Sequence, residues 1–207
     1  MFNTIYQELK KHAPFTFLGT MTGILLMAVF VFFKIPNSIS NNLFNIFHPV
    51  HVFFSAMVTT SMYCLHNDKK KLLNLLIIGY LGSVGIATLS DCIIPFFGEW
   101  LLNLPNRELH IGFITKWWLV NPLAIAGILV AWNWPKTRFP HMFHVLISTC
   151  ASLFHMTTSL NSGVSVITFL LITLFLFLAV WLPCCTSDII FPLLFQTPSR
   201  CKKNSNS

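Results

Sequence analysis

Long stretches without a charged residue constrain this chain more than any other feature. Residues 13–33 contain no Asp, Glu, Lys or Arg. An α-helix of about 20 residues crosses the roughly 30 Å hydrocarbon core of a bilayer, so this run is long enough to span it. Only 9% of the whole chain is charged and 55% is hydrophobic. Soluble domains carry about 25% charged residues, so most of this protein's surface is predicted to face lipid.

Six membrane-spanning helices are predicted from the spacing of the apolar runs and of the polar breaks between them. The predicted spans are residues 13–33, 48–65, 72–89, 113–134, 140–160 and 164–182. Pro49 suits the first turn of a helix, so the second span is expected to begin at His48 after a polar loop at 37–45. Pro95 is expected to break the third span and Pro183 the sixth, with Pro192 a little beyond it. The fold class is therefore an all-α membrane protein.

The basic residues predict how the chain sits in the membrane. With the N-terminus in the cytoplasm, 10 of the 13 Lys and Arg residues lie on the inner side and 3 on the outer side. Lys and Arg accumulate on the cytoplasmic side of membrane proteins, which favours both termini in the cytoplasm. The predicted location is the bacterial inner membrane or an equivalent plasma membrane, and the protein is multi-pass. The net charge of +7 is explained by these clusters, so nucleic-acid binding is not expected.

Polar motifs occur twice in the chain, separated by 93 to 98 residues. The matched pairs are His12 and His110, His48 and His141, His51 and His144, Ser55 and Ser148, Ser90 and Ser187, Asp91 and Asp188, and Pro95 and Pro192. Membrane helices mostly avoid these residue types, so their recurrence indicates a duplication. Residues 1–104 and 105–198 are predicted to be two three-helix repeats, followed by a polar tail at 199–207. Three is an odd number of spans, so the second repeat is inverted, as in many secondary transporters.

Two sets of three His and one Asp are the candidate metal ligands. The set predicted on the outer face is His48, His51, Asp91 and His110, and the set predicted on the inner face is His12, His141, His144 and Asp188. Residues at i and i+3 share a helix face, so both imidazoles of each His-x-x-His can point to one centre. Imidazole and carboxylate suit a divalent transition metal: zinc first, with iron, nickel, cobalt or manganese also compatible. The sequence thus predicts one metal site at each face of the membrane.

Further polar residues extend from these sets towards the middle of the membrane. Ser55 and Ser148 lie one turn beyond His51 and His144, and His155 continues the same face of its helix. These residues, together with Ser90 and Ser187, are candidates for an ion pathway or for supporting hydrogen bonds. The six cysteines show no C-x-x-C spacing, and Cys184-Cys185 is only a weak hint of metal or redox chemistry.

Three functions from different classes fit this pattern, and a transporter or channel for a divalent transition-metal ion is the one we predict. An intramembrane zinc-dependent hydrolase acting on a lipid amide or ester is the alternative. Three His, an Asp and a Ser resemble in residue type the alkaline ceramidase superfamily, although order and spacing differ. That resemblance implies zinc-activated water with Asp91 or Asp188 as base. A haem-binding electron carrier is the third, but it gives both aspartates no role.

The expected partners are membrane lipid and the metal ion. A homodimer is compatible with a wall of only six helices, so the oligomeric state stays open. No catalytic residue is assigned, because transport rather than catalysis is the main expectation.

Overall fold

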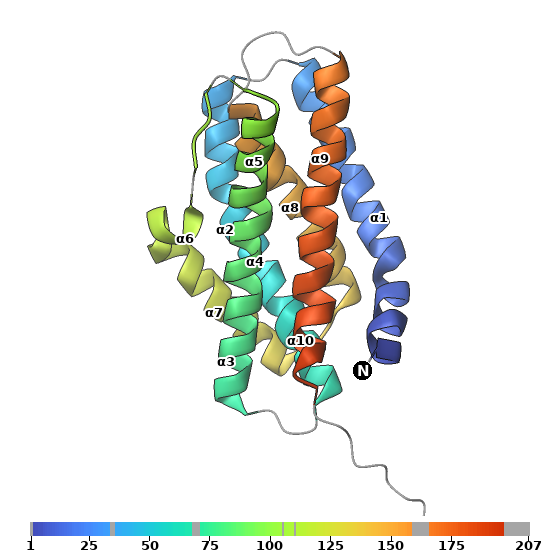
Figure 1. The fold of residues 1–207 in the computed structure, drawn as a ribbon. Coiled ribbons are helices and arrows are strands. Elements are labelled where there is room, and N and C mark those ends of the chain that lie inside the picture. Colours follow the sequence, from blue (N-terminus) through green and yellow to red (C-terminus); the bar gives the residue numbers. More distant parts are fainter. Residues whose placement is uncertain are drawn as a thin grey trace, which may run out of the picture.

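The computed structural model describes residues 2–33, 36–67, 71–104, 106–109, 111–158 and 166–196. All regular secondary structure within these residues is helical, and the long helices lie side by side in a bundle (Figure 1). The prediction of an all-helical protein is confirmed for the described residues.

The α-helices are joined in places by π-helical turns, in which the backbone bonds span five residues instead of four. The α-helices are α1 (Phe2–Phe32), α2 (Asn37–His66), α3 (Leu72–Tyr80), α4 (Ile86–Thr88), α5 (Ile94–Leu101), α6 (Gly112–Thr115), α7 (Trp117–Asn133), α8 (Arg138–Thr158), α9 (Val166–Cys185) and α10 (Phe191–Leu194). The π-helical turns are η1 (Leu81–Gly85), η2 (Leu89–Ile93) and η3 (Thr186–Ile190). Turns η1 and η2 connect α3, α4 and α5 into one rod, and η3 connects α9 to α10.

Three helical segments are long and apolar enough to cross a membrane. They are Ser38–His66, Leu72–Leu101 and Leu170–Leu194. Helix α7 is also apolar but has only 17 residues. Many large apolar side chains, including Phe17, Leu25 and Trp117, are exposed on the outside of the bundle. An apolar exterior of this kind is what a protein surrounded by lipid requires.

Helices α2 and α8 occupy the centre of the bundle. Helix α2 packs against α7 and α8, and α8 packs against α1 and α9. Ring contacts pair Phe44 with His155 and Phe54 with Phe143, so α2 and α8 run in opposite directions. The rod of α3–α5 and helix α9 lie across one side of this pair, and α1 begins near the end where α10 finishes (Figure 1). Side chains from α2 and α8 therefore meet in the interior.

Helix α2 begins earlier than the sequence predicted. It starts at Asn37 rather than at His48, and the segment 37–45 is helical instead of a loop. Pro49 consequently lies inside the helix, where its missing N–H removes one backbone hydrogen bond. Helix α1 likewise starts at Phe2 and contains Pro14. Neighbouring helices in a membrane bundle compensate for such prolines, so the helix does not have to end there.

The predicted breaks of the third and sixth spans are wrong, because α9 continues through Pro183 and only π-helical turns precede Pro95 and Pro192. The chain passes through η2 and η3 in front of these prolines and stays helical on both sides. Both η2 and η3 contain one of the repeated Ser-Asp pairs. Insertions of this kind occur frequently at functional sites because they redirect a side chain without ending the helix.

The carbonyl groups released by the two prolines are satisfied by hydroxyls from distant helices. In a π-helical register Pro95 would donate to the Ser90 carbonyl, but proline has no N–H. The Ser152 hydroxyl of α8 donates to that carbonyl instead, at 3.0 Å. Correspondingly, the Thr59 hydroxyl of α2 donates to the Ser187 carbonyl at 3.2 Å. Both turns are thus held in place by helices that come from the other half of the sequence.

Gly127 allows α7 to approach α2 closely. A Cβ at this position would lie 2.4 Å from the Phe53 carbonyl oxygen, a backbone atom that cannot rotate away. We expect Gly127→Ala to lower the midpoint of thermal unfolding in detergent, at a cost of about 1–3 kcal/mol typical of overpacking. Gly85→Ala is the control, because its Cβ would meet nothing within 4 Å. Equal losses in the two variants would contradict the close approach.

Candidate metal centre

Helix α2 and turn η2 form a first triad of His48, His51 and Asp91. The Nδ1 atoms of His48 and His51 lie 2.9 and 2.5 Å from the same Asp91 oxygen, Oδ2. The i, i+3 spacing places both imidazoles on one face of α2, and η2 turns the carboxylate towards them. All three side chains are buried, with at most 2% exposed.

Helix α8 and turn η3 form a second triad of His141, His144 and Asp188. The Nδ1 atoms of His141 and His144 lie 2.6 and 2.5 Å from Asp188 Oδ2. These side chains are equally buried. The contacts therefore repeat those of the first triad atom for atom.

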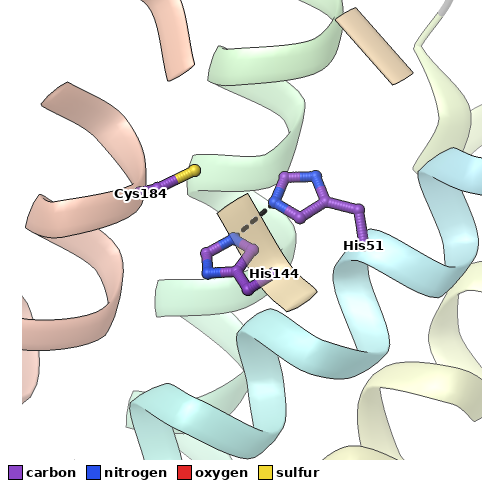
Figure 2. Close-up of side chains that lie close together, drawn as sticks. All are labelled: His51, His144 and Cys184. Atoms are coloured by element: carbon purple, nitrogen blue, oxygen red, sulfur yellow. Dashed lines mark hydrogen bonds between the residues drawn. The ribbon is translucent and has the colours of Figure 1, made fainter. Parts of the chain in front are cut away.

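The two triads meet in the interior. His51 Nε2 and His144 Nε2 are 2.5 Å apart, and the two rings stack with centroids 4.4 Å apart (Figure 2). The predicted separation of the two sets onto opposite faces of the membrane is therefore wrong. Helix α2 starts 11 residues before His48, which moves its His pair away from the helix end to the place where α8 crosses.

Two histidines of the predicted sets lie outside the triads. His110 falls outside the described residues, so its predicted role as a ligand stays a prediction. His12 joins neither triad, because its Nδ1–H donates to the Glu8 backbone carbonyl at 2.8 Å. Its ring instead packs edge-on against His141, with centroids 5.2 Å apart.

The predicted serines support the triads and their turns, Ser90 within its own half and Ser148, Ser55 and Ser187 across the two halves. Ser148 and Ser90 donate to the remaining Asp91 oxygen, Oδ1, at 3.0 and 2.9 Å. Ser55 lies 3.1 Å from Ser187, which in turn donates to the Gly82 carbonyl at 2.7 Å. These hydroxyls orient the carboxylate and the π-helical turns, as supporting hydrogen bonds do in metal sites.

His155 has a partner that the sequence did not indicate. Its Nδ1 lies 2.8 Å from Glu99 Oε1, and both side chains are buried. Glu99 lies between the predicted third and fourth spans and therefore outside both. The signal available was a single carboxylate beside Trp100 at the end of an apolar run.

Cys184 is the most consequential residue that the sequence did not assign. Its Sγ lies within 4.8 Å of the ligand nitrogens of His51 and His144, and it points towards them from α9 (Figure 2). It is buried, with 1% exposed. The available signal was its position four residues before Asp188, which places both on one helix face.

The hydrogen-bond pattern fixes which ring nitrogens carry hydrogen. A carboxylate only accepts, so His51 and His144 must each donate from Nδ1 to an aspartate. The other nitrogen of a neutral imidazole is then an acceptor. The two facing Nε2 atoms are therefore both acceptors. A positively charged species between them, either a proton or a metal ion, is needed to hold them together.

The charge of the site suits a divalent cation. Asp91 and Asp188 bring two buried negative charges, and the described residues include no buried Lys or Arg to offset them. Buried charges are normally paired or bound to metal, because an isolated one is costly. A divalent cation held by the two Nε2 atoms would neutralise both carboxylates, as would two protons on the four imidazoles that pair with them.

The geometry accepts a metal ion after a small opening. Nitrogen ligands lie about 2.0–2.1 Å from zinc, so two of them are roughly 3.4 Å apart in a tetrahedral site. His51 and His144 would separate by roughly 1 Å to reach this distance. Each would then have the carboxylate–imidazole–metal arrangement that orients most metal-binding histidines.

No protein family, curated protein or solved structure matches this chain. The chemistry of the two triads is therefore the basis for assigning a function.

Proposed function

We propose that this protein is a membrane transporter for a divalent transition-metal ion, with zinc the best fit, that binds its cargo at one central site between the two triads. The facing Nε2 atoms of His51 and His144, each backed by a buried carboxylate, carry the proposal. Imidazole nitrogen and the nearby thiol of Cys184 are ligands that zinc prefers, and iron, cobalt, nickel and manganese also accept imidazole.

The proposal includes six spans in two inverted repeats with both termini in the cytoplasm. It is supported by contacts that recur with the sequence offset, such as Ser152 on the Ser90 carbonyl and Thr59 on the Ser187 carbonyl. Secondary transporters built from inverted repeats bind their substrates near the middle of the bilayer, where the repeats meet. One central site fits this architecture better than the two separated sites predicted from the sequence.

Buried hydroxyls provide a route from the central site in both directions. Ser55 and Thr59 follow His51 along α2 at successive turns, and Ser148 and Ser152 follow His144 along α8. All four are fully buried. Because α2 and α8 run in opposite directions, the two rows lead towards opposite ends of the bundle. Their oxygens offer weak ligands to a partly dehydrated ion, which permits binding without trapping it.

The metal-dependent lipid hydrolase remains the second candidate, and the asymmetry of the site favours it. Cys184 lies beside the second triad, whereas Ala87 occupies the matching position of the first half. Asp188 Oδ1 has no hydrogen-bond partner among the described residues, while Asp91 Oδ1 lies within hydrogen-bond distance of three hydroxyls. Such a carboxylate oxygen is suited to accept a proton from metal-activated water. Fatty-acid release from lipid amides or esters by the zinc-loaded protein would identify this activity.

The double variant Asp91→Asn, Asp188→Asn tests the transport proposal. It removes both negative charges while keeping side-chain volume. Losing a supporting carboxylate costs roughly 10–100-fold in metal affinity, so loss of both should reduce zinc flux to the level of protein-free vesicles. Flux is measured in proteoliposomes with an enclosed zinc indicator, and helical circular dichroism checks the fold. Glu108→Gln, at an exposed position, is the control. Undiminished flux in the double variant would refute the proposal.

A further inference from the structure

We infer that Glu8 and His66 form a second, weaker binding site for the transported cation, at the end of the bundle where α1 begins and α2 ends. The identity of the cargo rests on the proposed function. The existence of the second site rests on contacts that are separate from the two triads.

The hydrogen bonding of His66 leaves one of its nitrogens facing a carboxylate. Its Nδ1 is 3.0 Å from the Met62 carbonyl oxygen, so this nitrogen donates its hydrogen to the backbone. The Nε2 of the neutral ring is then an acceptor. It lies 3.7 Å from Glu8 Oε1, which is also an acceptor. Two ligands of one tetrahedral metal ion are about 3.4 Å apart, so this pair is already spaced to share a cation.

His12 is fixed in the same way and lies between this pair and the second triad. Its Nδ1–H donates to the Glu8 backbone carbonyl, which leaves Nε2 as an acceptor. That Nε2 is buried and has no hydrogen-bond partner among the described residues. The His12 ring contacts His141 of the second triad, and the Nδ1 atom of His12 lies 3.8 Å from Glu8 Oε2. An unpartnered buried nitrogen between two anionic groups is suited to pass a cation from one to the other.

Accessibility distinguishes the second site from the centre. The side chains of Glu8 and His66 are 11% and 18% exposed, whereas those of both triads are at most 2% exposed. An ion from solution can therefore reach Glu8 and His66 without opening the bundle. The second site is thus placed to load or release the ion that the centre holds.

Lys11 makes this second site weak. Its Nζ lies 2.7 Å from Glu8 Oε1, the oxygen that faces His66. An incoming cation must displace the ammonium from this oxygen, and the two charges repel each other. Competition of this kind favours rapid exchange over tight retention.

The number of ions bound per chain tests the inference. Titration of the full-length protein in detergent with Co²⁺, followed by calorimetry and by cobalt absorption, should show one tight and one weak site. Glu8→Gln and His66→Gln should each remove the weak site and leave the tight one. The double variant His51→Gln, His144→Gln should lose the tight site and keep the weak one. Lys11→Gln should tighten the weak site by about fivefold or more, as expected when a partly buried ion pair worth at least about 1 kcal/mol no longer competes. Lys10→Gln, which removes the same charge at an exposed neighbour, is the control.

The outcomes separate this inference from the function on which it depends. A single tight site that Glu8→Gln and His66→Gln leave unchanged would overturn the second site while the transport proposal stands. Equal tightening by Lys11→Gln and Lys10→Gln would overturn the competition by Lys11, because general charge would then explain the change. Wild-type protein that binds no metal at all would overturn both proposals.

Discussion

Replacing His51 and His144 together with glutamine is expected to abolish binding at the central site. Their facing Nε2 atoms are the nitrogens that the hydrogen bonds to Asp91 and Asp188 leave available. Glutamine has similar reach and polarity but offers no imidazole nitrogen to a transition metal. Even loss of a residue that only supports a ligand costs about 10–100-fold in affinity, so loss of two ligands should exceed 100-fold. Calorimetric titration with Zn²⁺ measures this change.

Thermal unfolding provides an independent measurement of the same loss. A ligand present at about 100 times its dissociation constant stabilises the folded state by about 2.7 kcal/mol. Adding a chelator to zinc-loaded wild-type protein should therefore lower the midpoint of unfolding. The variant that carries both His51→Gln and His144→Gln should show no such decrease. His155→Gln is the matched control. His155 is a buried histidine of α8, the helix that carries His144, but it is paired with Glu99. A chelator effect of equal size in all three proteins would place the metal elsewhere.

Replacing Cys184 with serine is expected to change which metals the centre prefers. The thiol points at the two Nε2 atoms from α9 (Figure 2), and thiolate sulfur favours softer ions such as Zn²⁺ over Mn²⁺. Wild-type protein loaded with Co²⁺ should show intense sulfur-to-cobalt absorption, and Cys184→Ser should lose it while keeping bound cobalt. We also expect zinc affinity to fall by at least about tenfold, because a direct ligand contributes no less than a supporting residue.

The neighbouring cysteine provides the control for this experiment. Cys185 is adjacent in sequence but does not belong to the group of ligand atoms around His51 and His144. Cys185→Ser should therefore keep the sulfur-to-cobalt absorption. Absorption that survives in Cys184→Ser, or that the wild-type protein lacks, would show that the thiol is not a ligand.

The sequence predicted the components of the site better than its location. Each His-x-x-His pair and its aspartate were recognised from spacing alone, and the structure brings each of these sets into hydrogen-bond contact. The prediction placed the two His-Asp sets too close to the ends of the bundle, because the Asn- and Ser-rich segment before His48 has the composition of a loop. Its helical conformation depends on packing against other helices, which local composition does not report. Once α2 is extended by these turns, the two predicted sites become neighbours.

The sequence did not show which residues find their partners on distant helices. Cys184 matters because α9 passes beside the crossing of α2 and α8, and Glu99 because α5 passes beside His155. Periodicity shows which side chains share a face of one helix, but not which faces of different helices meet. The crossing of α2 and α8 is a property of the packed bundle, so it could not be derived from either helix alone.

The turns η2 and η3, each followed by a proline, have a consequence for how the chain folds. The Ser90 carbonyl is paired by Ser152 and the Ser187 carbonyl by Thr59, so each half supplies the hydroxyl that the other half lacks. An unpaired carbonyl surrounded by hydrocarbon costs several kcal/mol. Neither half can therefore complete its own backbone in isolation. We expect the two halves to fold as one cooperative unit, and fragments cut between them to be stable only when reassembled.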